Sequence, residues 1–174
     1  MKEQFIKIYK ENIKREGSDK LLEWLWDSDF FKAPASTRYH LACEGGLCEH
    51  SINVYNNFEC DNPETKAICA LLHDVCKINF YKSDFRNVKN ADGNWEKVPY
   101  YSIDEKFPFG HGEKSVFLIE RFMKLTIEEA VAIRFHMGEF EKDKATSDAY
   151  NKYTLAVLLH IADLKATFID EKTM

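Results

Sequence analysis

Residues 70–77 read Ala-Leu-Leu-His-Asp-Val-Cys-Lys, an apolar run that leads into an adjacent histidine and aspartate, His73 and Asp74. Asn62 followed by Pro63 has the pattern of a helix N-cap with proline at the first helical position, which predicts a helix over residues 63–77. An aspartate in such apolar surroundings is costly to bury without a partner. A divalent metal ion is a natural partner for buried histidine and aspartate side chains, so this segment predicts a metal site.

Other histidines and a second aspartate lie on further predicted helices on both sides of this segment. The spacing of apolar residues predicts helices over residues 47–58 and 111–123. A capping box at Thr126 begins a helix that ends at Gly138, and a last helix begins at Ser147. Five predicted helices therefore each contribute an imidazole or a carboxylate. The candidate metal ligands are His50, His73, Asp74, His111, His136 and Asp163.

The rest of the pattern adds two N-terminal helices and one β-hairpin. Helical spacing predicts a helix over residues 3–16, and Ser18-Asp19 is expected to cap a second, short helix. Two aromatic or β-branched runs, 80–88 and 95–101, flank a turn signal at residues 90–93. The predicted fold class is all-α, a helical bundle with a small β-hairpin insertion at about residues 80–101. We expect a single domain over residues 1–174, with helices of residues 1–32 packed on a metal-binding core of residues 33–168.

The composition is that of an ordinary soluble domain. Lys plus Arg number 24 against 29 Asp plus Glu, a formal charge of −5 that argues against a general polyanion binder. No apolar run approaches the ~18 residues of a membrane span, and the charged start does not resemble a signal peptide. The five cysteines, an odd number without a Cys-x-x-Cys pair, predict a reduced, cytoplasmic protein without disulfides. Cys69 and Cys76 are interpreted as small core residues.

The types of ligand limit which metal ions the site can bind. Imidazole and oxygen ligands without a thiolate suit iron, manganese, zinc, nickel or cobalt. An aspartate can bridge two ions, and two ions about 3.5–4 Å apart clamp both the attacking and the leaving oxygen of a phosphoryl group. One ion would take His50, His73, Asp74 and Asp163, and a second would take Asp74 as a bridge together with His111 and His136. The predicted cofactor is therefore a pair of divalent transition metal ions.

This order of ligands on helices resembles the HD-domain superfamily of metal-dependent phosphohydrolases, over a stretch from about Ala33 to Ala166. The segments 33–40, 45–50, 110–111 and 136–138 resemble the HD domain of bacterial 3′→5′ exoribonucleases that carry an OB-fold. Met137 stands where that family has a second histidine, and these residues contain no OB domain ahead of the HD core. The chain is also similar to standalone HD-domain hydrolases of Firmicutes and their phages.

The resemblance implies a phosphohydrolase that acts on a nucleotide or a short oligonucleotide through a metal-activated water. Lys77 occupies the superfamily's His-Asp-x-x-Lys position, where a lysine often faces the phosphate, so Asp74 and Lys77 are the expected catalytic residues. Lys77 would also project toward the site from one helical turn beyond His73. Arginine is suited to bidentate recognition of phosphate. The expected substrate-binding residues are Arg38, His40, Lys77, Arg86, Lys89 and Arg134.

Several alternatives stay open from the sequence. Lys77 also fits a helix-end lysine stabilised by the helix dipole, and Arg86 and Lys89 fit a solvated face of the hairpin. His40 and His160 fit either contacts at the site or ordinary surface and core histidines. The aromatic residues of the hairpin can stack a nucleobase, but such a set more often packs a hairpin onto helices. They are Tyr81, Phe85, Trp95, Tyr100 and Tyr101.

Two other functions also fit the same ligands. Some HD-fold proteins, such as those resembling inositol oxygenase, are di-iron oxygenases. A non-catalytic module could keep the site in order to hold a nucleotide. The sequence leaves the oligomeric state and the identity of the substrate open.

Overall fold

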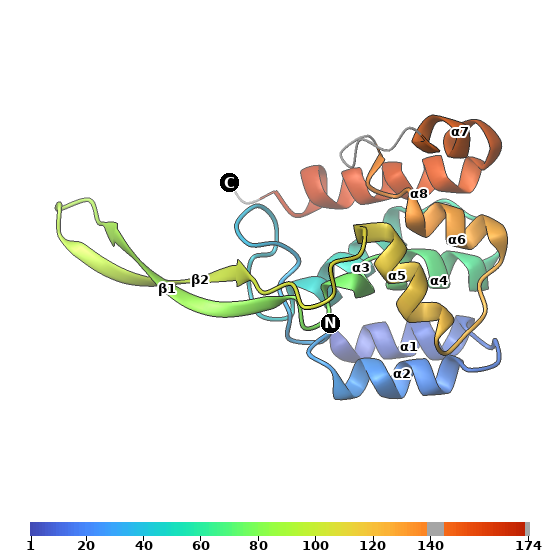
Figure 1. Cartoon of the computed structure of the whole chain (residues 1–174), viewed down its shortest axis with the longest axis horizontal. Helices are drawn as coiled ribbons and strands as arrows, with labels where there is room; N and C mark the ends of the chain where they lie inside the picture. Colours follow the sequence, from blue (N-terminus) through green and yellow to red (C-terminus); the bar gives the residue numbers. More distant parts are fainter. Residues whose placement is uncertain (139–144, 173–174) are drawn as a thin grey trace.

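The computed structural model describes residues 1–138 and 145–172, which form a mostly helical body and a two-stranded antiparallel sheet (Figure 1). The predicted combination of helices with a small hairpin is confirmed. The described α-helices are α1 Lys2–Asn12, α2 Ser18–Asp27, α3 Gly46–Asn57, α4 Pro63–Leu72, α5 His111–Glu120, α6 Ile127–Arg134, α7 Ala145–Lys152 and α8 Thr154–Lys165. Within these ranges, every helix is too short or too polar to cross a membrane. The prediction of one domain over residues 1–174 includes residues 139–144 and 173–174, which lie outside the described residues.

The helix α4 is the centre of the body. Its residues 67–72 are buried on every side, as expected of a helix that is apolar all round. Helices α3, α6 and α1 pack around α4, and α8 crosses both α3 and α6 (Figure 1). This packing brings the C-terminal end of α4, where His73 and Asp74 follow, to the middle of the helical body.

The helix after Asn62 begins as predicted but ends early. The Asn62 side chain accepts hydrogen bonds from the backbone N–H groups of Glu64 and Thr65, at 3.0 and 3.1 Å. The prediction that the helix continues to residue 77 is wrong, because α4 ends at Leu72 and a 3-10 turn follows over Val75–Lys77. The N–H of Cys76 donates to the Ser115 hydroxyl of α5 at 3.1 Å, a tertiary bond that replaces an α-helical one.

Further boundaries differ from the sequence pattern: α6 ends at Arg134 and not at Gly138, and α5 ends at Glu120 and not at residue 123. The chain leaves α1 after Asn12, because Ile13 is extended and residues 13–17 turn toward α2. The N-cap of α2 is Gly17 and not Ser18; Gly17 has φ +88°, and a Cβ there would lie 1.8 Å from the Phe122 carbonyl oxygen. The single last helix predicted from Ser147 is two helices, since the extended Tyr153 separates α7 from α8.

The hairpin projects from the helical body (Figure 1). Its strands β1 Tyr81–Lys89 and β2 Trp95–Ile103 pair in register from Tyr81↔Ile103 to Lys89↔Trp95. At about 3.4 Å per residue, strands of this length extend roughly 30 Å. Phe85 and Trp95 are 60% and 69% exposed, so the interpretation that the hairpin aromatics pack onto helices is wrong for both. Only near its base does Tyr81 reach the body, where its hydroxyl donates to the Ala35 carbonyl at 3.3 Å.

A buried carboxylate ties three parts of the helical body together. Glu129 of α6 accepts hydrogen bonds from both Arg15 terminal nitrogens at 2.5 and 3.0 Å, and from the Thr65 hydroxyl of α4 at 2.9 Å. It also completes the predicted capping box, since the Thr126 N–H donates to it at 2.8 Å. Every lone pair of this buried group therefore has a nearby donor, which offsets the cost of removing the charge from water.

Replacing Glu129 with alanine should lower the free energy of unfolding by roughly 3 kcal/mol, because Arg15 would lose its buried partner. Glu128→Ala is the matched control: this neighbouring glutamate in the first turn of α6 is exposed. Urea unfolding followed by circular dichroism measures both changes. Equal effects of the two substitutions would contradict a structural role for the Arg15–Glu129 pair.

Candidate metal centre

The structure brings all six candidate ligands together at the centre of the helical body. Helix α3 contributes His50, α4 is followed by His73 and Asp74, α5 begins with His111, α6 is followed by His136, and α8 contributes Asp163. Four of these side chains are almost completely removed from solvent: His50, His73, Asp74 and His136. Buried ionisable groups from five helices therefore meet at one point.

Asp74 lies between two pairs of histidines. Its Oδ1 atom is 2.8 Å from His111 Nε2 and 3.5 Å from His136 Nε2. Its Oδ2 atom is 3.5 Å from His73 Nε2 and 3.6 Å from His50 Nε2. Each carboxylate oxygen thus faces its own pair of imidazoles, the arrangement that a carboxylate bridging two cations requires.

The second carboxylate lies on the side of His50 and His73. Asp163 Oδ1 is 3.2 Å from His50 Nε2, and the Nε2 atoms of His50 and His73 are 3.3 Å apart. The ligand atoms of His50, His73 and Asp74 all lie within 4.8 Å of one another, as do those of His73, His136 and Asp163. Such convergence gives a cation several donors within reach of one point.

Hydrogen bonds on the outer nitrogens orient two of these rings. His73 Nδ1 lies 2.9 Å from the Ala70 carbonyl and His136 Nδ1 lies 2.6 Å from the Ile133 carbonyl. A carbonyl oxygen can only accept, so each Nδ1 carries the proton and each Nε2 presents a lone pair to the centre. Within the described residues, His136 Nε2 is buried and has no hydrogen-bond partner. A metal ion fits this donor set, because it would satisfy that lone pair.

The carboxylates at the centre are held ionised. Burial by itself raises the pKa of Asp74, but the Lys77 ammonium, 2.6 Å away, and the neighbouring imidazoles hold this pKa well below its usual range. Burial also raises the pKa of Asp163, yet the hydrogen bond with His50 and the charges of the neighbouring imidazoles together outweigh burial and lower this pKa as well. Two ionised carboxylates in one buried cluster attract cations.

The pKa values of two histidines in the cluster shift in opposite directions. Burial lowers the pKa of His73 to about 3, which keeps the ring neutral, as a metal ligand must be. Burial acts on His50 in the same direction, but its hydrogen bonds with Asp163 and Glu171 raise its pKa to about 9. A cation at the centre would therefore compete with a proton for His50 Nε2.

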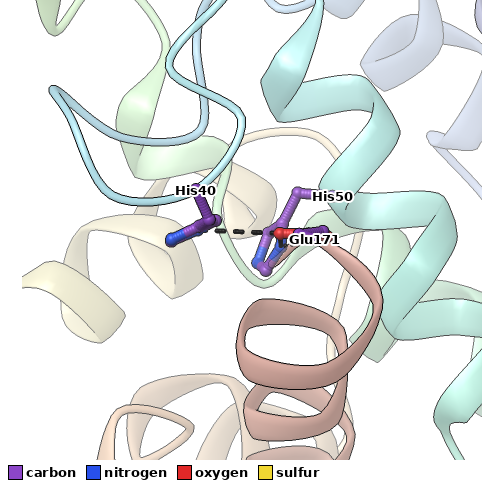
Figure 2. A group of neighbouring side chains, drawn as sticks. All are labelled: His40, His50 and Glu171. Atoms are coloured by element: carbon purple, nitrogen blue, oxygen red, sulfur yellow. Dashed lines mark hydrogen bonds and ion pairs between the residues drawn. The ribbon is translucent and has the colours of Figure 1, made fainter. Parts of the chain in front are cut away.

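Glu171, which the sequence analysis missed, lies beside His50 (Figure 2). It contacts the Nδ1 atom of this ring, whereas Nε2 faces Asp74. His50 Nδ1 lies 3.0 and 3.1 Å from the two Glu171 carboxylate oxygens, and the Asn53 side chain donates to one of them at 2.9 Å. A π-helical turn over Ala166–Asp170 returns the chain from α8 to this position. A carboxylate on the outer nitrogen of a metal-binding histidine orients the ring and makes it a stronger ligand. Glu171 lies in a charged terminal segment without hydrophobic periodicity, so the sequence carried no signal for it.

His40 lies on the other side of Glu171 (Figure 2). Its Nε2 atom is 3.9 Å from a Glu171 oxygen, and its ring centroid is 5.1 Å from that of His50. Burial lowers the pKa of His40, and the neighbouring His50 lowers it further. The structure therefore places His40 at the site and not on the open surface.

A pocket of about 540 Å³ opens onto the cluster. Its buried end includes Asp74 and Lys77, whereas the exposed rings of Tyr39 and Phe168 line its outer part. His160 also lines the pocket, while its Nδ1 donates to the His136 carbonyl at 2.6 Å. The remaining lining residues are His40, His50, His111, Met137, Asp163, Leu164 and Thr167. The pocket thus combines charged groups at its inner end with apolar side chains nearer solvent.

The other expected substrate-binding residues are not among the described residues that line the pocket. Arg38 is exposed and donates to the Tyr39 hydroxyl at 2.8 Å. Arg134 forms an ion pair with Glu113 at 2.6 Å. Arg86 and Lys89 lie on the projecting strand β1. Two of the expected substrate-binding residues, His40 and Lys77, do line the pocket.

Cys76 is a second residue at the centre that the sequence analysis did not identify. Cys69 is buried in the apolar core, as expected, but the Cys76 thiol lies 3.3 Å from His111 Nδ1. Cys76 is buried, as expected of a core residue, but its thiol also contacts a histidine of the candidate centre. All five cysteines are free, in agreement with the expected absence of disulfides.

Replacing Glu171 with alanine should weaken binding of zinc by roughly 10- to 100-fold, because the outer nitrogen of His50 would lose its carboxylate. Isothermal titration of the purified chain measures this affinity. Asp170→Ala is the control. In the described part of the chain the Asp170 side chain accepts a hydrogen bond from Asn57, and it lies outside the cluster. An unchanged affinity in Glu171→Ala would exclude a role for this carboxylate in the metal centre.

The chain was also compared with known proteins. No model of a protein family, no curated protein and no solved structure matches it. The functional argument therefore depends on the chemistry of the site and on the order of its residues along the chain.

Proposed function

We propose that this chain is a metal-dependent phosphohydrolase of the HD-domain type that hydrolyses a phosphoester in a nucleotide or short oligonucleotide. The observation that carries the proposal is the position of Asp74, whose two carboxylate oxygens each face a separate pair of imidazole nitrogens. One carboxylate shared between two sets of ligands is what a two-metal centre needs. The order of these residues along the chain supports the same conclusion through its resemblance to the superfamily.

Two divalent ions would be held by the six converging side chains. His50, His73 and Asp163 would serve one ion, His111 and His136 would serve the other, and Asp74 would bridge them. When bound, such a pair lowers the pKa of a water molecule toward ~7 and stabilises charge on a phosphoryl group.

Lys77 is the residue of this chain best placed to bind the phosphate. Its ammonium lies 2.6 Å from Asp74 Oδ2 and lines the pocket. Burial lowers the pKa of Lys77, but the Asp74 carboxylate and the neighbouring groups together outweigh burial and raise this pKa, which keeps the ammonium charged. A fixed positive charge beside the reacting group offsets the charge on phosphate oxygens. This contact favours a hydrolase over an oxygenase, whose substrate need not be anionic.

The outer part of the pocket suits the remainder of a nucleotide. Its volume of about 540 Å³ is in the usual range for small-molecule sites. Tyr39 and Phe168 are 70% and 62% exposed, so their rings are accessible to a ligand that enters the pocket. Aromatic side chains of this kind stack on nucleobases. A phosphate at the buried end would leave the base close to these rings.

The hairpin would contact only a substrate longer than the pocket. Lys89 Nζ lies 5.4 Å from the centroid of the Trp95 ring and the Arg86 guanidinium lies 5.7 Å from that of Tyr100. Cations beside exposed aromatic rings form the combination that binds single-stranded nucleic acids. The proposed roles of Arg86 and Lys89 therefore apply to an oligonucleotide and not to a mononucleotide.

Asp74→Asn should reduce hydrolysis of bis(p-nitrophenyl) phosphate and of a nucleotide panel to the background rate, because the shared carboxylate charge is lost. The metal-free chain is first loaded with manganese, iron or zinc, and released product is measured. Asp61→Asn, an exposed aspartate in a loop, is the control for a lost charge elsewhere. Circular dichroism confirms that both variants are folded.

Turnover of Asp74→Asn equal to that of the unsubstituted chain would refute the hydrolase proposal. Oxygen consumption by the iron-loaded chain without any phosphate release would instead support the di-iron oxygenase. Stable retention of a nucleotide without turnover would support the binding module.

The double substitution Arg86→Ala/Lys89→Ala should raise KM for a single-stranded oligonucleotide by about tenfold, while hydrolysis of mononucleotides stays unchanged. The expected size follows from the loss of two exposed phosphate contacts of about 0.5–1 kcal/mol each. Lys20→Ala/Lys32→Ala, two exposed lysines away from the hairpin, controls for the lost charge. Equal KM values for the oligonucleotide would show that the hairpin takes no part in substrate binding.

A further inference from the structure

The Cys76 thiol lies beside the ligands of the proposed second metal ion. Its Sγ atom is 3.3 Å from His111 Nδ1, 3.6 Å from His111 Nε2 and 4.0 Å from Asp74 Oδ1. Cys76 is only 3% exposed, and the bond from its N–H to the Ser115 hydroxyl fixes its backbone against α5. The thiol is therefore held next to the centre by the fold.

The spacing of these three groups is that of ligands around one ion. Zinc bonds of about 2.0–2.1 Å to nitrogen, 2.3 Å to sulfur and 2.0–2.2 Å to oxygen place the ligand atoms of a tetrahedral site roughly 3.4–3.6 Å apart. Here the three separations are 2.8 Å from His111 Nε2 to Asp74 Oδ1, 3.6 Å from His111 Nε2 to Sγ, and 4.0 Å from Asp74 Oδ1 to Sγ. Adjustments of at most about 0.8 Å would give all three separations zinc-like values.

A fourth side chain, His136, independently supports a bound ion at this position. His136 Nε2 is 3.5 Å from Asp74 Oδ1, and like the two ring nitrogens of His40 it is buried without a hydrogen-bond partner among the described residues. Its Nδ1 is occupied by the Ile133 carbonyl, so the free lone pair is directed toward Asp74. The ligand atoms of Asp74, Cys76 and His111 lie within 4.8 Å of one another, and His136 adds a nitrogen next to the same Asp74 oxygen.

We propose that Cys76 is a thiolate ligand of the second metal ion, and that this half of the centre takes an ion of the zinc class in preference to manganese or magnesium. The proposal rests on the metal centre described above but not on the reaction catalysed there. Thiolate ligands favour zinc and related ions, whereas manganese and magnesium favour oxygen ligands. Binding replaces the S–H bond with a sulfur–metal bond and releases the proton to solvent.

The sulfur ligand makes the two halves of the centre chemically unequal. The half with His50, His73 and Asp163 offers nitrogen and oxygen atoms, while the half with Cys76 adds sulfur. The predicted ligand set without a thiolate would then apply only to the first half. Different ions could occupy the two halves of one chain.

Titration with cobalt(II) tests the proposal. The metal-free chain should take up to two equivalents of cobalt and develop a sulfur-to-cobalt charge-transfer absorption in the near ultraviolet. Cys76→Ser should lose this absorption, whereas Cys43→Ser, which changes an exposed cysteine, should retain it. Because Cys76→Ser could fail to fold, X-ray absorption of the zinc-loaded unsubstituted chain provides a second measurement, with one sulfur expected at about 2.3 Å.

The outcomes separate this proposal from the one on which it rests. Cobalt or zinc bound by nitrogen and oxygen alone would overturn the thiolate ligand and leave the metal centre intact, with Cys76 acting only as a hydrogen-bond partner of His111. Failure to bind any divalent ion would overturn both. A charge-transfer absorption that survives in Cys76→Ser would also overturn the assignment, because another cysteine would be its source.

Discussion

The buried negative charge of Asp74 is the constraint around which this fold is arranged. Only 2% of this residue is exposed, and it remains ionised because Lys77 and four imidazoles surround it. Lys77 and His73 flank Asp74 in the same segment, whereas His50, His111 and His136 come from other parts of the fold, so the local segment supplies only part of this stabilisation. The packing of α3, α5 and α6 around the end of α4 therefore serves electrostatics as well as apolar burial. The outer hydrogen bonds of the imidazoles in turn fix which nitrogen each ring turns toward Asp74.

Much of the site could be predicted from the sequence, because the residues that form it interrupt apolar segments. His73, His136 and Asp163 each follow hydrophobic residues on a predicted helix, and a polar group in such a position must find a partner on folding. The N-cap at Asn62 and the capping box at Thr126 are local signals, and both were read correctly. The turn of the hairpin was also predictable, because the turn signal includes Gly93, which adopts a positive φ of +81°.

What the sequence could not show depends on tertiary contacts. The end of α4 at Leu72 follows from a hydrogen bond to Ser115, which is distant in sequence, and that bond also decides where Cys76 and Lys77 point. Glu171 reaches His50 only because α8 is extended by a π-helical turn. The exposure of Phe85 and Trp95 depends on the direction in which the hairpin leaves the body, and alternation along a strand carries no information about that direction.

The 121 positions between His50 and Glu171 also have a consequence for biosynthesis. A ribosome releases the helix that carries His50 long before it adds the carboxylate that orients this imidazole. Domains generally acquire structure from the N-terminal side as they emerge, so the nascent chain can assemble α1 to α6 while the centre still lacks two of its acidic groups. Full affinity for a cation would then arise only after residue 171 has been added, when the helices around the centre have already been synthesised.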